Sequence, residues 1–395
     1  MTKKAIIIII SLVVAIGIGA TAYTVSTGVF NPYEQQIRLG YKFLSEMNYE
    51  QALIAFDKAI SIEAKRDKAY IGKADTYFAK GNEDMTAVLM KIDEGFKTGD
   101  DMLAMHDESA KIGNEMLVMI NESLKVGYEL TQSEKIIDTY IRLADKFTDI
   151  GRTDLALKLL QLGYNTIGNE RLKDRIDKVT SSFLKVMFDL FEAGNVDEAR
   201  NRMSTFEFEA IASLASETEP MFYSPTSSST LKSGKGIGIY RVQGQDFYTA
   251  EGWYFVYYGD YADNVRSGHG IFLANWFTFE GQWQNDKPNG QGKETHGYGN
   301  EIHRTVEATY QDGFYNGQVI DSDTVENEIC IFKYFCADGI PTKIDGTVLV
   351  TPNGDMIAYT YANEESGRWH REYVLGGKMG LLGYEIPGTY PEYLQ

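Results

Sequence analysis

The histidines and paired carboxylates of this chain are its first candidates for metal binding or acid–base chemistry. The closest histidine pair, His296 and His303, has no cysteine or acidic residue at the spacing of a metal site. The adjacent carboxylates Asp100–Asp101 and Glu364–Glu365 are more typical of solvated turns than of an acid–base pair. The sequence therefore predicts no metal site and no catalytic residue among these groups.

Motifs for phosphate binding and nucleophilic catalysis are missing as well. Residues 234–238 read Gly-Lys-Gly-Ile-Gly, but the Lys-Ser/Thr ending and the helix of a phosphate-binding loop do not follow. No serine stands in the Gly-x-Ser-x-Gly context of a nucleophile elbow. We therefore expect no cofactor and no enzymatic activity. A hydrolase within residues 328–395 is the weaker alternative.

The acidic charge of the chain excludes one class of partner. The chain has 395 residues, with 56 acidic against 38 basic side chains and a formal net charge of -18. Such a chain repels phosphate backbones, so nucleic acid is not an expected partner. The length allows two or three folding units, and the hydrophobic content of 43% favours packed cores over disorder.

The N-terminal segment, residues 1–30, has the composition of a membrane anchor. After Lys3 and Lys4, residues 5–25 carry no charge, and as a helix they would span about 31 Å, enough for a ~30 Å hydrocarbon core. The two lysines predict that the N-terminus is cytoplasmic and that the later domains are extracytoplasmic. A cleaved signal peptide is the alternative, because residues 20–22, Ala-Thr-Ala, have the form of a cleavage site. Both interpretations place the later domains beyond the membrane.

Residues 31–216 carry the apolar periodicity of helices. Asn31-Pro32 supplies a capping residue and a first-turn proline, and a break near Asn48 separates two apolar stripes. Two short helices joined by a small turn would form a helical hairpin. Small and aromatic residues occupy fixed places in this hairpin, and they are Gly40, Phe43, Ala52, Phe56 and Ala59.

This spacing resembles the tetratricopeptide (TPR) repeat, whose unit has about 34 residues. A shift by one unit places Ala74 and Tyr77 on the next first helix, with Gly81 at its end. Further copies fit residues 136–165 and, less closely, residues 183–206. The resemblance implies a superhelix of helical hairpins that binds a peptide or a neighbouring protein on its concave face.

A change of composition marks the end of the helical half. Residues 217–233 contain two prolines and a run of serine and threonine, which predicts a linker. Beyond them, aromatic residues and glycine dominate, and strand-length runs alternate with turns. Residues 277–283 place aromatic side chains and Gly281 on one strand face, and residues 286–290 are rich in turn formers. This pattern predicts a β-hairpin.

The hairpin pattern occurs twice in full. One copy is Tyr257, Gly259, Tyr261, Gly268 and Gly270, and the other is Phe279, Gly281, Trp283, Gly290 and Gly292. These residues resemble the MORN repeat. The resemblance implies a ribbon of single β-hairpins over residues 234–327, used in protein–protein contact, membrane apposition and scaffolding.

A third copy runs from Val306 to Tyr310, with Ala308 in place of the first glycine and Val319 in place of the last. Beyond it the repeat is lost, and residues 328–395 are interpreted as a divergent β extension or a cap that protects the end of the stack.

The expected fold is therefore multidomain, α then β: a transmembrane helix, a TPR-like α-solenoid and a MORN β-hairpin ribbon. The expected function is that of a membrane-anchored, non-enzymatic interaction or scaffold protein of the cell envelope. The alternative is a glycan-binding module, in which exposed aromatic side chains stack on sugar rings. The residues for that role would be Tyr254, Tyr257, Trp276 and Trp283.

Overall fold

The computed structural model divides into two compact units, Met1–Val179 and Thr180–Gln395. It describes residues 31–93, 99–215, 219–227, 231–242, 253–298, 301–325, 328–338, 340–344, 348–350 and 356–358. The predicted membrane segment, residues 5–25, lies outside these ranges. Across the described ranges, no helix is both long enough and apolar enough to cross a membrane.

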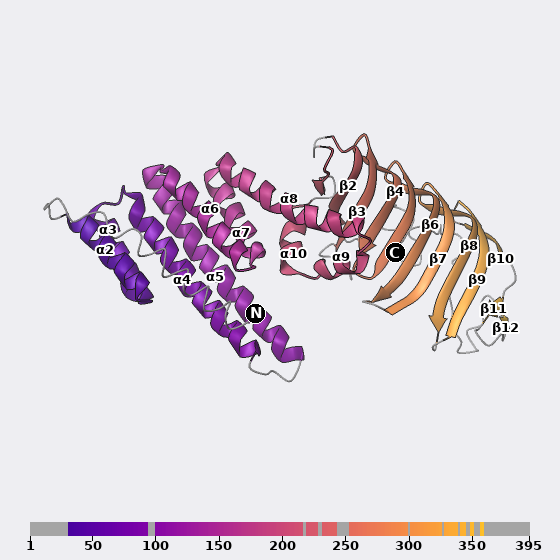
Figure 1. The fold of residues 1–395 in the computed structure, drawn as a ribbon, viewed down its shortest axis with the longest axis horizontal. Coiled ribbons are helices and arrows are strands. Elements are labelled where there is room, and N and C mark those ends of the chain that lie inside the picture. The colour runs from indigo at the N-terminus through magenta and orange to yellow at the C-terminus, as the bar shows by residue number, and fades with distance from the viewer. Residues whose placement is uncertain are drawn as a thin grey trace. The chain divides into compact units, whose positions relative to one another are not determined.

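The first unit consists of helices that pack as hairpins (Figure 1). Its helices are α2 (Pro32–Ser45), α3 (Tyr49–Ile62), α4 (Asp67–Asp93), α5 (Gly99–Thr131), α6 (Glu134–Asp149), α7 (Thr153–Ile167) and the first part of α8 (Glu170–Glu192). Helix α2 packs on α3, α4 on α5, and α6 on α7. The prediction that the N-terminal half is helical is confirmed.

The first hairpin has the predicted cap at its start and a second cap at the predicted break. The Asn31 side chain accepts hydrogen bonds from the backbone N–H groups of Tyr33 and Glu34, and Pro32 occupies the first turn of α2. Asn48 caps α3 by accepting a hydrogen bond from the Gln51 N–H. The helix break near Asn48 therefore combines a positive φ of 59° at Met47 with a capping side chain at Asn48.

Phe56 explains two glycines of the helical unit. A Cβ on Gly40 of α2 would lie 2.6 Å from Cε1 of the Phe56 ring, and a Cβ on Gly72 of α4 would lie 2.8 Å from its Cδ1. The ring is fully buried, as are Ala52 and Ala59 on the same helix. Close packing of three helices around one ring thus requires the small residues of the template.

The second hairpin differs from the predicted one. Gly81 was expected at a helix end, but α4 continues through it to Asp93. A Cβ on Gly81 would lie 2.5 Å from the Met116 sulfur of α5, so this glycine permits close helix packing and does not end the helix. Helices α4 and α5 have 27 and 33 residues, longer than a repeat of about 34 residues per hairpin allows.

The second unit contains a sheet of ten antiparallel strands that lie side by side in chain order (Figure 1). Its strands are β1 (Met221–Tyr223), β2 (Gly234–Val242), β3 (Trp253–Ala262), β4 (Val265–Ala274), β5 (Phe277–Gln284), β6 (Lys287–Tyr298), β7 (Glu301–Gln311), β8 (Phe314–Val325), β9 (Glu328–Ala337) and β10 (Ile340–Ile344). Two short strands, β11 (Val348–Val350) and β12 (Met356–Ala358), pair separately. Strand β1 lies within residues 217–233, the segment expected to be a linker, and pairs with β2.

Residues 180–215 form one unit with the sheet, although the sequence grouped them with the helical half. The second part of α8 places Phe191 in a stacked contact with Tyr258 of β3, with ring centroids 4.9 Å apart. Helices α9 (Val196–Arg202) and α10 (Phe206–Ala212) follow. The Arg200 guanidinium donates to the Asn275 carbonyl at 3.0 Å, which fastens α9 to the turn between β4 and β5.

Candidate functional site

A row of glycines crosses the repeat sheet at right angles to the strands. Each member pairs with the next on the adjacent strand, and the order is Gly236, Gly259, Gly270, Gly281, Gly292 and then Ala308. The row joins the first repeat glycine of one copy to the last repeat glycine of the same copy. The two glycines pair across one hairpin, so the length of that hairpin sets their separation in the sequence.

Aromatic rings lie over this glycine row. A Cβ on Gly270 would lie 2.5 Å from Cε2 of Tyr257, and a Cβ on Gly292 would lie 2.6 Å from Cζ of Phe279. Real side chains do not approach so closely, so each ring requires a glycine on the neighbouring strand. The aromatic residue and the last glycine of a MORN-like unit are thus two halves of one contact.

The rings of successive units also contact one another. Trp283 lies edge-to-face with Tyr257 at 5.0 Å and with Phe279 at 5.4 Å, and Phe279 lies edge-to-face with Tyr310 at 5.1 Å. All four side chains are at most 3% exposed. Two residues of the glycan-binding alternative, Tyr257 and Trp283, are therefore wrong as sugar platforms because they form the core. Tyr254 and Trp276 remain partly exposed.

The other repeat glycines have a different role. Gly268, Gly290 and Gly317 have φ angles of +61°, +116° and +99°, and each lies where the strand register shifts by a β-bulge. Positive φ is strained for any residue with a Cβ, so a glycine is favoured at each bulge.

The position of the hairpin turn differs from the prediction. Asn285 and Asp286 form the turn between β5 and β6, with φ angles of +52° and +66°, and Pro288 and Gly290 lie inside β6. Two adjacent residues with positive φ are typical of the two-residue turn whose twist matches that of antiparallel strands. The expected turn over residues 286–290 is therefore corrected to Asn285–Asp286.

The third copy shows which glycines depend on the ring. Val306 stands at the place of the aromatic residue, and it is fully buried. Without a ring above the row, Ala308 and Val319 occupy the glycine positions and pair with each other. Gly317 is kept, because its bulge requires positive φ whether or not a ring is present.

A buried arginine lies between the aromatic core and the β5–β6 turn. Arg266 is 7% exposed, and its guanidinium carbon lies 4.9 Å from the centre of the Trp283 ring and 5.0 Å from that of Tyr240. Its Nε donates to Asp286 Oδ1 at 3.0 Å. The charge is thus paired and surrounded by rings, which is the condition under which a buried cation is tolerated.

A second buried charge lies on β6. Glu294 is 1% exposed, and its carboxylate accepts hydrogen bonds from the hydroxyls of Tyr310 at 2.6 Å and Tyr315 at 2.9 Å. His296 contacts the other carboxylate oxygen at 3.0 Å. Three side chains of the core therefore satisfy this carboxylate. In the part of the sheet that the structure describes, the Glu294 carboxylate is buried and hydrogen-bonded to other side chains, so it is not accessible to a substrate.

The opposite face is polar and exposed over β5 to β7, and it extends to His269 on β4. His269 pairs with Glu280 at 3.5 Å, Lys293 with Glu307 at 3.3 Å, and Gln291 donates to Thr309 at 2.7 Å. The four ion-pairing side chains are between 53% and 59% exposed. This face, defined by His269, Glu280, Gln291, Lys293, Glu307 and Thr309, is named the polar face. It is available for contact with a partner, whereas the aromatic face is filled by its own rings.

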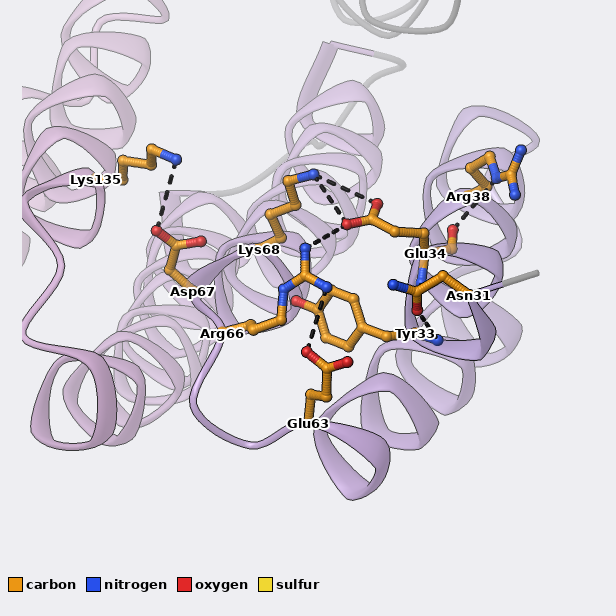
Figure 2. A network of polar contacts seen from close by, with 9 residues as sticks. All are labelled: Asn31, Tyr33, Glu34, Arg38, Glu63, Arg66, Asp67, Lys68 and Lys135. Atoms are coloured by element: carbon orange, nitrogen blue, oxygen red, sulfur yellow. Dashed lines mark hydrogen bonds and ion pairs between the residues drawn. The ribbon is translucent and has the colours of Figure 1, made fainter. Parts of the chain in front are cut away.

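Polar contacts also link the helices of the first unit, as Figure 2 shows around Glu34. Glu34 of α2 pairs with Arg66, just before α4, and with Lys68 of α4 at 3.3 Å. The Arg66 guanidinium carbon lies 4.1 Å from the centre of the buried Tyr33 ring, and the burial of Tyr33 raises its pKa to about 12. Asp67 accepts a hydrogen bond from Ser133 at 2.6 Å, which connects α4 to the cap of α6.

One helix of the first unit presents an apolar stripe. Met119, Val126 and Leu130 of α5 are 39%, 43% and 43% exposed. They are seven and four residues apart, so they share one face of the helix. We name these three residues the α5 stripe.

The described residues form no cluster of side chains that could hold a metal. No three histidine, cysteine, aspartate or glutamate side chains converge within the described ranges. His269 and His296 each contact a glutamate, and His303 is exposed on β7.

Comparison with protein families identifies the repeat. The model of the MORN repeat matches residues 257–276 and 279–300. The MORN prediction is thereby confirmed for residues 257–300, which are the two intact copies whose geometry is described above. No curated protein matches the chain.

Proposed function

We propose that this chain is a non-enzymatic interaction or scaffold protein. The observation that carries this proposal is the presence of MORN repeats at residues 257–300, within a sheet whose aromatic residues are buried and whose polar face is exposed. MORN repeats often mediate protein or membrane interaction. An acidic chain of net charge -18 favours a protein partner over an anionic lipid surface.

The helical unit would supply a second contact surface. Its three hairpins and the close packing of Phe56 on Gly40 and Gly72 support the proposal of a TPR-like array. The α5 stripe supports a protein partner for this unit, because apolar side chains in one row lose unfavourable contact with water when a partner covers them.

Residues 5–25 would anchor the chain in a membrane, with the N-terminus cytoplasmic and both units extracytoplasmic. The support for this proposal is the uncharged run of sequence and the two lysines before it. The mass of the mature chain purified from its own cells separates an anchor from a cleaved signal peptide, because cleavage after Ala22 would remove the first 22 residues.

Crosslinking of the full-length chain in its native membrane tests the interaction function. Glutamate substitutions at Val126 and Leu130 are expected to remove a crosslinked protein if the α5 stripe is a contact surface. Lys125→Glu is the matched control, since it places the same side chain on the neighbouring exposed position of the helix. Recovery of no crosslinked protein by the wild-type chain contradicts the scaffold proposal.

A further inference from the structure

A pocket of about 400 Å³ lies within the second unit, between its short helices and the sheet. Its walls come from the end of α9, the start of α10, the first residues of β3 and the turn between β4 and β5. The volume is within the range of about 300–1,000 Å³ that small-molecule sites occupy. Its described lining residues belong to the same compact unit.

The pocket combines an apolar floor with aromatic walls. Met203 and Phe208 form part of the floor and are 6% and 3% exposed. Tyr254 and Trp276 are partly exposed, and Phe206 is 48% exposed. Tyr254 and Trp276 are the two residues of the glycan-binding alternative that remain partly exposed, and both line this pocket, although Trp276 also packs against the aromatic core.

The remaining lining groups are polar and lie at the surface. Ser204, Glu209 and Asn275 line the pocket and are exposed, so a hydroxyl, a carboxylate and an amide are within reach of a ligand. Among the lining residues that the structure describes, one is acidic and none is lysine or arginine. The carboxylate disfavours an anionic ligand, and the polar groups favour a ligand rich in hydroxyl donors.

Three hydrogen bonds hold the backbone of the aromatic wall in place. Arg200 donates to the carbonyls of Ala274 and Asn275 in the turn that carries Trp276. The Trp276 carbonyl accepts a hydrogen bond from the Gly297 N–H at 3.1 Å. The backbone of the pocket wall is thus fixed before any ligand arrives, which lowers the ordering cost of binding.

We infer that this pocket is a binding site for a neutral saccharide. The apolar C–H face of a pyranose ring packs on an aromatic side chain, and its hydroxyl groups donate to carboxylate and amide oxygens. Tyr254 and Trp276 supply the stacking surfaces, and Glu209 and Asn275 supply the acceptors. An organic cation would contact the aromatic rings and pair with the Glu209 carboxylate, but it would not need the hydrogen bonds that Ser204 and Asn275 offer.

Saturation-transfer NMR on the full-length chain tests this site. The probes are neutral gluco-, galacto- and manno-oligosaccharides and N-acetylglucosamine oligomers, each up to about 10 mM, since open sites of this size bind weakly. At least one oligosaccharide is expected to bind the wild-type chain. Trp276→Ala and Tyr254→Ala are each expected to weaken its binding about tenfold or more, and Trp276→Phe less, because a ring remains.

Glu209→Gln and Glu207→Gln form the matched pair of controls. Each variant removes one negative charge from α10, but of the two residues only Glu209 is among the described lining residues of the pocket. Loss of binding in Glu209→Gln with retention in Glu207→Gln supports the site, provided that tryptophan emission shows both variants to be folded.

Three results would overturn the inference. They are the failure of every oligosaccharide to bind, binding that is unchanged in folded Trp276→Ala and Tyr254→Ala variants, and preferential binding of choline chloride at the same residues. None of them bears on the protein partners sought by crosslinking, so this site and the scaffold proposal can fail separately.

Discussion

The Phe279 ring lies across the backbone of Gly292 on the adjacent strand, where a Cβ would be 2.6 Å from its Cζ. The same relationship joins Tyr257 to Gly270, and it is missing where Val306 replaces the ring. The aromatic and glycine positions of these repeats are therefore coupled physically. One cannot change without a cost unless the other changes with it.

Gly292→Ala is expected to destabilise the second unit by about 2–3 kcal/mol, because the added methyl group must displace a fully buried ring. Tryptophan fluorescence during urea unfolding is a suitable measurement, since all four tryptophans follow residue 250.

The double variant Phe279→Val with Gly292→Ala tests the coupling directly. It places an aliphatic residue at the ring position and a residue with a Cβ at the last-glycine position, as Val306 and Val319 do in the third copy. Its loss of stability should be smaller than the sum of the two single losses by about 1 kcal/mol or more. Additive losses would show that ring and glycine act independently.

Gly317→Ala separates backbone strain from crowding. Nothing lies within 4 Å of a Cβ at this position, but φ is +99°. The expected cost is about 1–2 kcal/mol, from the positive φ alone, and it should not change when Val306 is replaced. A cost as large as that of Gly292→Ala would mean that the bulge glycine also packs against a side chain.

Arg266 and Lys293 should differ widely in importance, although both form ion pairs. Arg266 is 7% exposed and surrounded by rings, so Arg266→Ala is expected to cost about 2–4 kcal/mol. The Lys293 side chain is 53% exposed, and Lys293→Ala is expected to cost less than about 1 kcal/mol. Added salt should reduce the second effect and leave most of the first. Equal costs in urea unfolding would contradict this assignment of the core.

Local patterns predicted the repeats well, because the ring, the close glycine and the bulge glycine all lie within one hairpin. They misplaced the turn, since Pro288, Asn289 and Gly290 have the composition of a turn, whereas Gly290 serves a bulge inside β6. Composition alone does not distinguish the two uses of a glycine with positive φ.

Long-range packing could not be predicted from the same patterns. The apolar stripe that contains Phe188 and Phe191 looks alike whether it faces a helix or a sheet, and here it meets Tyr258 of β3. For the same reason the sequence could not predict which of its candidate sugar-binding residues are buried and which are exposed. These residues are Tyr254, Tyr257, Trp276 and Trp283. The separation depends on strand register and on helices that lie about fifty residues earlier in the chain.

Cys336 offers a test of the far end of the sheet. This thiol is free, 4% exposed and part of the aromatic core, and burial raises its pKa to about 12. A thiol in the unfolded chain titrates near about 8.5, so the folded chain holds this proton more tightly. The stabilisation from Cys336 should therefore be complete below about pH 8.5 and should be lost as the pH rises towards about 12.

The sequence has one other cysteine, Cys330, and replacing it by serine leaves Cys336 as the single thiol. In this Cys330→Ser chain at about pH 9, Cys336 should react slowly with a thiol reagent when folded and rapidly in urea. The Cys336→Val chain should lose less free energy of unfolding than the wild-type chain as the pH rises from about 8.5 towards about 12. Rapid reaction of the folded Cys330→Ser chain would show that the aromatic core does not bury Cys336.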